Sequence, residues 1–350
     1  MSKLRIGALI VFVGITLFGV WLFTYRHHAV TVVPLTANPH VQEAYWKGRI
    51  SAVGPVRAYS EFGNAVQDLT PQKQHEDAHA FGGALYQIAG VGGLSTCDAR
   101  FSFGCFHEFL GRAIAALGLG SVGSLNEGCI EALGAGSLSC QHGIGHGVLA
   151  YLGYTGDDLN KALRICKDLP HNDPIGGCYG GVFMEYNLQT MLGTEGRIRP
   201  PTSDMQAPCD SVADAYKTAC YFWQPQWWRQ NFFVAGMTDD DRAYAAAGVL
   251  CAQVPAPYTR TCFEGIGNIA PSDAHFDGAR TRTLCEDASS DPTDRLYCKS
   301  LAADSLFVGA DAKEDATAVC ADLPADQYRY CIVYASNSAN IAMPLEAPSL

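Results

Sequence analysis

The cysteines constrain this chain more than any other residue type, because all fourteen fall into seven pairs that recur along the sequence. Within a pair the two cysteines are 8 to 13 residues apart, and successive pairs begin 32 to 43 residues apart. Such a period is typical of a repeat protein, in which each unit buries its apolar face against its neighbours. The pairs are Cys97/Cys105, Cys129/Cys140, Cys166/Cys178, Cys209/Cys220, Cys251/Cys262, Cys285/Cys298 and Cys320/Cys331.

The cysteine count also predicts the compartment. An even number with no leftover thiol is typical of a disulfide framework formed in an oxidising space. We therefore expect the bulk of the chain to be extracytoplasmic, in a periplasmic or extracellular space. Pairing within a unit is the simplest connectivity because the loops are short, but pairing between adjacent units remains open.

The N-terminus predicts a membrane anchor. Residues Ile6–Tyr25 form a run of twenty residues without a charge, flanked by Arg5 and Arg26. As a helix rising about 1.5 Å per residue, this run covers the roughly 30 Å hydrocarbon core of a bilayer. It lacks the small-residue site of a cleaved signal peptide. We therefore expect residues 1–28 to be a signal anchor, a single-pass transmembrane helix that makes the membrane a partner of this protein.

Each repeat unit is predicted to be a pair of helices joined by a short polar loop. An apolar stretch carries the first cysteine near its end and the second cysteine opens the next helix, as in Leu159–Pro170 followed by Cys178–Tyr186. The predicted fold class is therefore all-α, with disulfide-stapled αα-hairpin repeats arranged as an α-solenoid or a compact helical array. We expect residues 29–69 to form a linker and N-terminal cap, 70–342 the repeat domain and 343–350 a flexible tail.

The composition limits the function classes. Apolar residues make up 48% of the chain and aromatic residues 11%, which is enough to build a buried core. The formal net charge is -11. Nucleic acid is therefore not an expected partner, because binding it requires clustered lysine and arginine.

Five of the ten histidines follow the repeat. Aligned on the second cysteine of each unit, His107 and His142 occupy one helical position, and His146 lies four residues after His142. His75 and His79, just upstream of the first cysteine pair, fit the same pattern of histidine positions within a unit, which we call the histidine frame. Residues four apart share a helix face, and equivalent positions of adjacent repeats lie side by side. The five side chains are therefore predicted to converge.

A converging set of imidazoles with nearby carboxylates suits a transition-metal ion. We predict a metal site with the five histidines and Glu185 as candidate ligands, and with Zn, Cu or Fe as the cofactor. Glu76 and Glu108 are candidate catalytic bases, so the site is a candidate for catalysis as well as for binding. Histidines at helix contacts are also often core residues held by a hydrogen bond, and this alternative stays open.

The segment His75–His79 also matches the zinc-protease pattern HExxH, in which two histidines hold zinc and the glutamate, here Glu76, activates water. Gly82 extends the match, but Leu85 stands where a metzincin protease has its third histidine. The other units keep the histidine frame without the full motif. We therefore assign the match to the repeat rather than to a protease.

A second function class stays open, that of a binding scaffold. Stacked hairpins can present a groove to a protein, peptide or glycan partner, and the histidines are then structural. The aromatic run Tyr221–Phe233 is the candidate recognition surface in that case. Packing in the core beside an irregular loop at residues 193–204 is the simpler explanation of this run. Metal content separates the two function classes.

Overall fold

We describe the fold from a computed structural model, which covers residues 33–336 apart from 171–172, 174, 195 and 310–311. The chain divides into two compact units, Met1–Thr36 and Ala37–Leu350. The predicted anchor at residues 1–28 and the predicted tail at residues 343–350 lie outside the described residues. All the helices below belong to the second unit.

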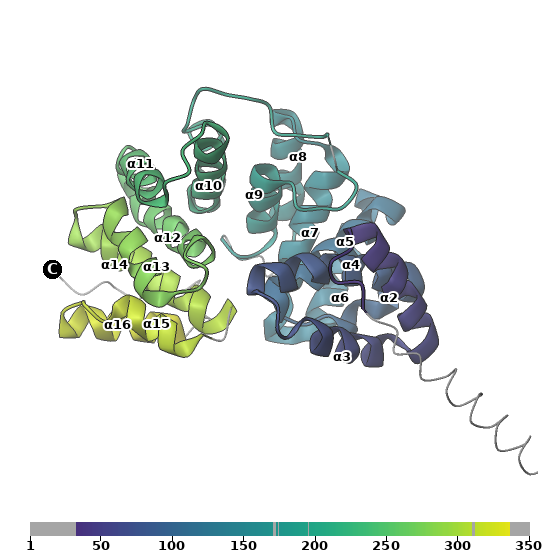
Figure 1. Ribbon diagram of the computed structural model, residues 1–350. Helices are drawn as coiled ribbons and strands as arrows, with labels where there is room; N and C mark the ends of the chain where they lie inside the picture. The colour runs from purple at the N-terminus through teal and green to yellow at the C-terminus, as the bar shows by residue number, and fades with distance from the viewer. Residues whose placement is uncertain (1–32, 171–172, 174, 195, 310–311, 337–350) are drawn as a thin grey trace, which may run out of the picture. The chain divides into compact units, whose positions relative to one another are not determined.

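The described part of the second unit is all-α, which confirms this part of the predicted fold class. The described residues form fifteen α-helices, short 3₁₀ segments and one π-helical turn, with no β-strand (Figure 1). The α-helices are α2 (Pro39–Val53), α3 (Pro55–Val66), α4 (Pro71–Ala89), α5 (Gly104–Leu117), α6 (Val122–Leu133), α7 (Ser137–Leu152), α8 (Gly156–Lys167), α9 (Cys178–Leu188), α10 (Asp214–Val234), α11 (Asp240–Ala252), α12 (Ala256–Asp273), α13 (Gly278–Ala288), α14 (Pro292–Asp304), α15 (Lys313–Cys320) and α16 (Ala325–Ser336).

Within the same described residues, no single helix is long and apolar enough to cross a bilayer. One bent pair, Phe101–Leu117 with Leu119–Leu133 at 118°, meets the length and composition requirements when the two helices are taken together.

Polar side chains cap the N-termini of six of the helices. Each accepts a hydrogen bond from a backbone N–H of the first turn, a group that has no partner inside the helix. Thr155 and Asp158 form a reciprocal capping box at the start of α8. The six capping residues are Asn38, Thr70, Thr155, Asp239, Asp277 and Asp291.

The helices pack as consecutive hairpins. Within the hairpins α6 contacts α7, α8 contacts α9, α11 contacts α12, α13 contacts α14, and α15 contacts α16. The second helices of the hairpins also pack on one another in chain order, from α4 and α5 through α7, α9, α10, α12 and α14 to α16. This row places α4, α5, α7 and α9 next to one another, and these helices carry the predicted metal ligands.

Each of the seven cysteine pairs forms a disulfide within its own unit, with Cα atoms 5.4 to 6.1 Å apart. The simplest predicted connectivity is therefore confirmed. The bridges link adjacent helices, as Cys166 in α8 and Cys178 in α9 illustrate. Each bridge closes a short loop and stabilises the folded state by roughly 3 kcal/mol, because it reduces the entropy of the unfolded chain. So many disulfides indicate an extracytoplasmic protein.

Glycines allow the neighbouring helices of the row to approach closely. A Cβ atom on Gly82 of α4 would lie 2.2 Å from the carbonyl oxygen of Cys105 in α5. A Cβ atom on Gly181 of α9 would lie 1.9 Å from the carbonyl oxygen of His142 in α7. A side chain at either position would push the two backbones apart, so only glycine permits this spacing.

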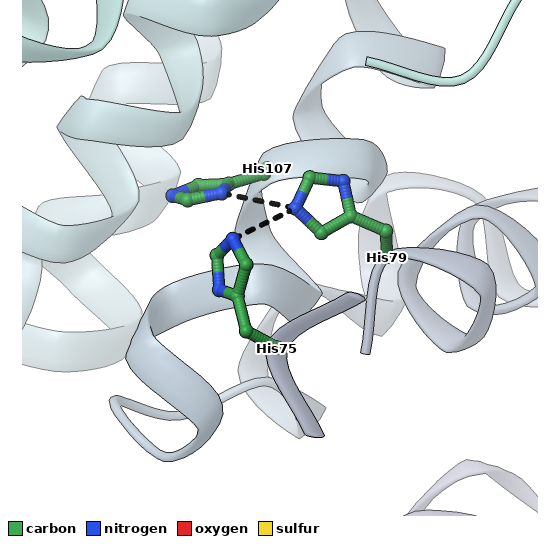
Figure 2. Close-up of side chains that lie close together, drawn as sticks. All are labelled: His75, His79 and His107. Carbon is green, nitrogen blue, oxygen red and sulfur yellow. Dashed lines mark hydrogen bonds between the residues drawn. The ribbon is translucent and has the colours of Figure 1, made fainter. Parts of the chain in front are cut away.

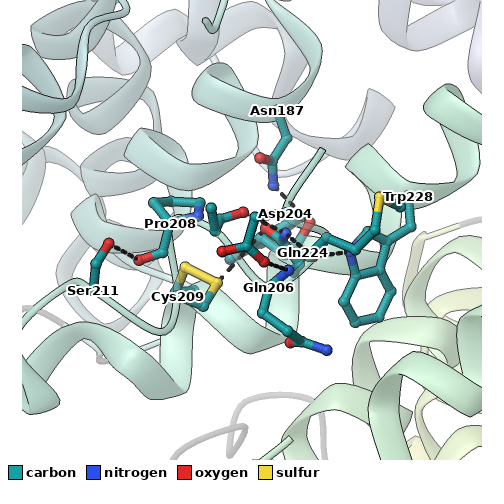
Figure 3. Close-up of a disulfide and its surroundings, with 12 residues drawn as sticks. Asn187, Asp204, Gln206, Pro208, Cys209, Ser211, Gln224 and Trp228 are labelled. Carbon is teal, nitrogen blue, oxygen red and sulfur yellow. Dashed lines mark hydrogen bonds between the residues drawn. A yellow bond between two sulfur atoms is a disulfide. The ribbon is translucent and has the colours of Figure 1, made fainter. Parts of the chain in front are cut away.

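An irregular segment, residues 189–213 apart from 195, lies between α9 and α10 and is held by side chains of α10 (Figure 3). Nε2 of Gln224 donates to the carbonyl oxygens of Met205 and Ala207, at 2.9 and 2.7 Å. The indole N–H of Trp228 donates to the same carbonyl of Met205. The loop predicted from the sequence is therefore present, and it is longer than expected.

The aromatic run lies in α10 and packs mostly inward. The guanidinium of Arg199 lies 3.6 Å from the ring centroid of Trp227, and Nε1 of Trp223 donates to the carbonyl oxygen of Ile175 at 3.1 Å. Only Phe233, at the end of the run, has a largely exposed ring, with 60% of its surface accessible. The buried aromatic residues of the run are Tyr221, Phe222, Trp223, Trp227 and Trp228.

Candidate metal centre

The five predicted histidines lie on three adjacent helices. His75 and His79 are one turn apart on α4, His107 is on α5, and His142 and His146 are one turn apart on α7. His75 is partly exposed and the other four side chains are buried. The packing of α4 on α5 and of α5 on α7 brings all five rings together, as the repeat frame predicted.

The first group consists of His75, His79 and His107, which point toward a common centre (Figure 2). Nε2 of His79 lies 3.3 Å from Nε2 of His75 and 3.3 Å from Nδ1 of His107. The ligand nitrogens of a tetrahedral zinc ion with Zn–N bonds of about 2.1 Å lie about 3.4 Å apart. The observed spacing therefore fits a bound ion.

The orientation of the three rings fits as well. Their centroids are 4.9, 5.1 and 5.2 Å apart, and the ring planes meet at 72 to 74°. When three imidazoles bind one zinc ion with tetrahedral geometry and Zn–N bonds of about 2.1 Å, their ring centroids lie about 5 Å apart. Nearly perpendicular rings let each nitrogen lone pair point at the same centre.

A strained turn fixes the ring of His75. Nδ1 of His75 lies 2.9 Å from the carbonyl oxygen of Phe101, which can only accept a hydrogen bond. The proton of neutral His75 is therefore on Nδ1, and Nε2 offers its lone pair to the group. Phe101, Ser102 and Phe103 have φ of 58°, 47° and 67°, a left-handed backbone that side chains disfavour. Such strain tends to occur at functional sites.

Burial favours the neutral form of His75, His79, His107 and His142, which is the form that binds a metal. Loss of solvation on burial lowers the pKa of His75. It lowers the pKa values of His79, His107 and His142 well below the usual range of histidine. Since burial disfavours the charged ring, a metal ion meets little competition from protons at neutral pH.

The second group consists of His107, His142 and His146, so His107 belongs to both groups. One ring nitrogen of each residue lies within 4.8 Å of the others. Nε2 of His142 lies 3.1 Å from Nε2 of His146. Nδ1 of His142 lies 3.1 Å from the carbonyl oxygen of Gly176.

Glu185 lies behind the second group and orients His146. Nδ1 of His146 donates to Oε2 of Glu185 at 2.9 Å, and both side chains are fully buried. The backbone N–H and the hydroxyl of Thr190 donate to the same oxygen at 3.0 and 2.8 Å, and the hydroxyl of Tyr154 donates to Oε1. Burial alone would raise the pKa of Glu185, but these hydrogen bonds outweigh it and the pKa is lowered. A carboxylate in this position is placed to orient a metal-bound histidine, so the role of Glu185 as a ligand itself stays a prediction without support from the geometry.

The structure does not bring Glu76 or Glu108 to the histidines. Glu76 is exposed, and its carboxylate accepts a hydrogen bond from Gln72 at 3.3 Å. Glu108 is buried and pairs with Arg112 at 2.7 Å, and it accepts from the backbone N–H of Leu192 at 2.9 Å. Burial raises the pKa of Glu108 to about 7. Catalytic roles for these two glutamates stay predictions without support from the geometry.

Several groups around the centre were not found from the sequence. They are the carbonyl groups of Phe101 and Gly176 and the side chains of Tyr154 and Thr190. All four lie in turns or loops outside the histidine frame, so the spacing of the repeat carries no signal for them.

No protein-family model matches this chain, and neither a curated protein nor a solved structure shows significant similarity to it. The site must therefore be judged by its own chemistry. Neutral imidazoles without a thiolate ligand suit Zn, Cu or Fe. Nε2 of His107 is buried and has no hydrogen-bond partner within the described part of the chain. An unpaired buried nitrogen is costly in a purely structural cluster, so it favours a ligand on this side of the His107 ring.

Proposed function

We propose that this protein binds a transition-metal ion through His75, His79 and His107. The observation that carries the proposal is the spacing of the three ligand nitrogens, with two separations of 3.3 Å across two adjacent helices. The hydrogen bond from His75 to a backbone carbonyl adds support, because metal-bound histidines commonly donate their other ring N–H to such an acceptor.

Zn, Cu and Fe are the proposed metals, because all three bind neutral imidazole. Three protein ligands leave a coordination position for water or a substrate, which is the arrangement of catalytic zinc sites. His75 is the partly exposed member of the group, so an incoming molecule would reach the ion from its side. Catalysis at that position is therefore part of the proposal, with the reaction left unnamed.

The proposal also includes the location. The uncharged run Ile6–Tyr25 supports an N-terminal membrane anchor, and the seven disulfides support a repeat domain on the extracytoplasmic side. A stack of hairpins in the manner of an α-solenoid is consistent with the row of second helices. The binding-scaffold alternative has less support, because the tryptophans of its candidate surface are buried.

Metal analysis of the purified protein tests the proposal. The full-length chain, without an affinity histidine tag, is produced in an oxidising compartment, extracted in detergent and reconstituted with Zn²⁺, Cu²⁺ or Fe²⁺. We expect tightly bound metal in the parent, a lower metal content in His75→Ala and His79→Ala, and the metal content of the parent in His40→Ala, whose side chain is exposed. Circular dichroism and a non-reducing peptide map confirm that each variant is folded. Absence of bound metal in the reconstituted parent would refute the proposal.

A further inference from the structure

His142 and His146 form a second pair of convergent imidazoles, and their ring protons can be located. Nδ1 of His142 faces the carbonyl oxygen of Gly176 at 3.1 Å, and Nδ1 of His146 faces the carboxylate of Glu185 at 2.9 Å. Both oxygens accept hydrogen bonds and cannot donate one. In the neutral form of either ring the proton is therefore on Nδ1, and Nε2 carries a lone pair.

These two lone pairs face each other. The Nε2 atoms are 3.1 Å apart, with both rings buried. Two lone pairs at this distance repel each other unless a positive centre lies between or beside them. The nitrogens of a tetrahedral zinc ion lie about 3.4 Å apart, so the pair has the separation that an ion requires. The carbonyl and the carboxylate behind the rings are the usual partners of metal-bound histidines.

A shared proton would also remove the repulsion between His142 and His146, and His107 distinguishes the two explanations. Nδ1 of His107 faces His79, whereas Nε2 is buried and has no hydrogen-bond partner among the described residues. Figure 2 shows this second nitrogen on the far side of the ring from His79. A proton held by His142 and His146 would leave Nε2 of His107 without a partner, but a metal ion would use it.

We propose that the five histidines hold two metal ions, with His107 as a ligand of both. Nδ1 of His107 binds the ion shared with His75 and His79, and Nε2 binds the ion shared with His142 and His146. This inference rests on the proposed function, since it adds a second ion to the same centre. A ring that binds an ion through both nitrogens loses its remaining proton, so one proton is released into solvent for each bridge that forms.

The bridge requires one small rearrangement. The rings of His107 and His146 are stacked with centroids 4.3 Å apart and planes 28° apart, so their lone pairs do not yet meet at one point. Glu185 holds His146 in place, whereas Nε2 of His107 has no hydrogen-bond partner among the described residues. The second ion therefore requires a tilt of the His107 ring that brings Nε2 toward His142 and His146 while Nδ1 stays at the first ion.

Metal stoichiometry and magnetic coupling test the inference. The full-length apoprotein in detergent is titrated with Cu²⁺, and bound copper is counted after removal of the excess. We expect two equivalents per chain in the parent and one in each of His75→Ala and His142→Ala. An imidazolate bridge couples the two Cu²⁺ spins, so the paramagnetic resonance signal of the parent should account for far less than the bound copper. The single-site variants should show their full signal.

Three results would overturn the inference. One equivalent in the parent that is lost in His75→Ala but kept in His142→Ala would leave a single ion in the first group and the proposed function intact. Two uncoupled ions would exclude the bridge. Absence of copper, zinc and iron from the parent would remove the proposed function together with the second ion. The coupling is read in the parent itself, so the test does not depend on the folding of a His107 variant.

Discussion

A Cβ atom placed on Gly82 would lie 2.2 Å from the carbonyl oxygen of Cys105, so α4 and α5 touch backbone to backbone at this point. Gly104 makes a similar contact on the same interface, where a Cβ atom would lie 2.5 Å from the carbonyl oxygen of His75. This close contact sets the distance between His75 and His79 on one helix and His107 on the other. Helix packing and metal geometry are therefore linked.

The Gly82→Ala substitution tests that link. The added methyl group forces α4 away from α5, and we expect the free energy of unfolding to fall by roughly 1–3 kcal/mol, as for other overpacked cores. Zinc affinity should fall as well, because the ligand nitrogens separate. Urea denaturation and zinc titration measure the two effects.

Gly48→Ala is the control, since Gly48 lies exposed in α2 with open space around it. It should raise stability by roughly 0.5–1 kcal/mol and leave zinc binding unchanged. Identical behaviour of the two variants would contradict the link.

Removal of the Cys97–Cys105 disulfide should weaken metal binding. This bridge closes the turn whose Phe101 carbonyl orients His75. We expect Cys97→Ser with Cys105→Ser to lose roughly 2–3 kcal/mol of stability, from the chain-entropy relation for so short a loop, and to bind zinc less tightly. Calorimetric titration with zinc measures the affinity.

The matched control removes the Cys320–Cys331 bridge, which lies at the other end of the domain in sequence. Its loop entropy is similar, so it should lose a similar amount of stability. Its zinc affinity should be that of the parent. Equal losses of affinity in both double variants would mean that general destabilisation, rather than the orientation of His75, controls binding.

Glu185→Gln should weaken the second ion and spare the first. The amide keeps the shape of the side chain but removes the negative charge that strengthens the hydrogen bond from Nδ1–H of His146. Loss of such an orienting partner typically costs 10- to 100-fold in metal affinity. Stepwise titration with Co²⁺, followed by its visible absorption, should show one unchanged and one weakened site. Glu76→Gln, at an exposed position, should change neither. A uniform decrease at both sites would contradict the assignment of Glu185 to the second ion.

Asp304 should make stability depend on pH. Burial raises the pKa of this carboxyl to about 7, and one of its oxygens has no hydrogen-bond partner among the described residues. The ordinary pKa in the unfolded chain is about 3.9. The folded state thus binds the proton more tightly. The contribution of protonated Asp304 is fully present below pH 4 and is lost as pH rises through 7.

Asp304→Asn, a neutral mimic of the protonated acid, should therefore match the parent near pH 4. It should exceed the parent by up to about 4 kcal/mol at pH 8, from about 1.4 kcal/mol for each unit of pKa. Chemical denaturation at a series of pH values measures the difference. The exposed Asp326→Asn serves as the control. A stability gain for Asp304→Asn that does not vary with pH would contradict this account.

The sequence predicted the hairpins and the convergence of the five histidines, because both follow from periodic spacing. The sequence was a poorer guide to which carboxylates lie near the histidines. Glu76 and Glu108 each adjoin a histidine in sequence, but consecutive residues lie about 100° apart around a helix, so their side chains point away from the site. Tyr154 and Thr190 lie in loops whose paths depend on tertiary packing, and no periodic pattern reports on them.

The most direct test of the central claim is anomalous diffraction from crystals of the zinc-loaded protein. We expect a zinc peak at bonding distance, about 2.1 Å, from Nε2 of His75, Nε2 of His79 and Nδ1 of His107. A fully loaded crystal whose zinc lies only at surface positions, with the three rings unliganded, would contradict the claim.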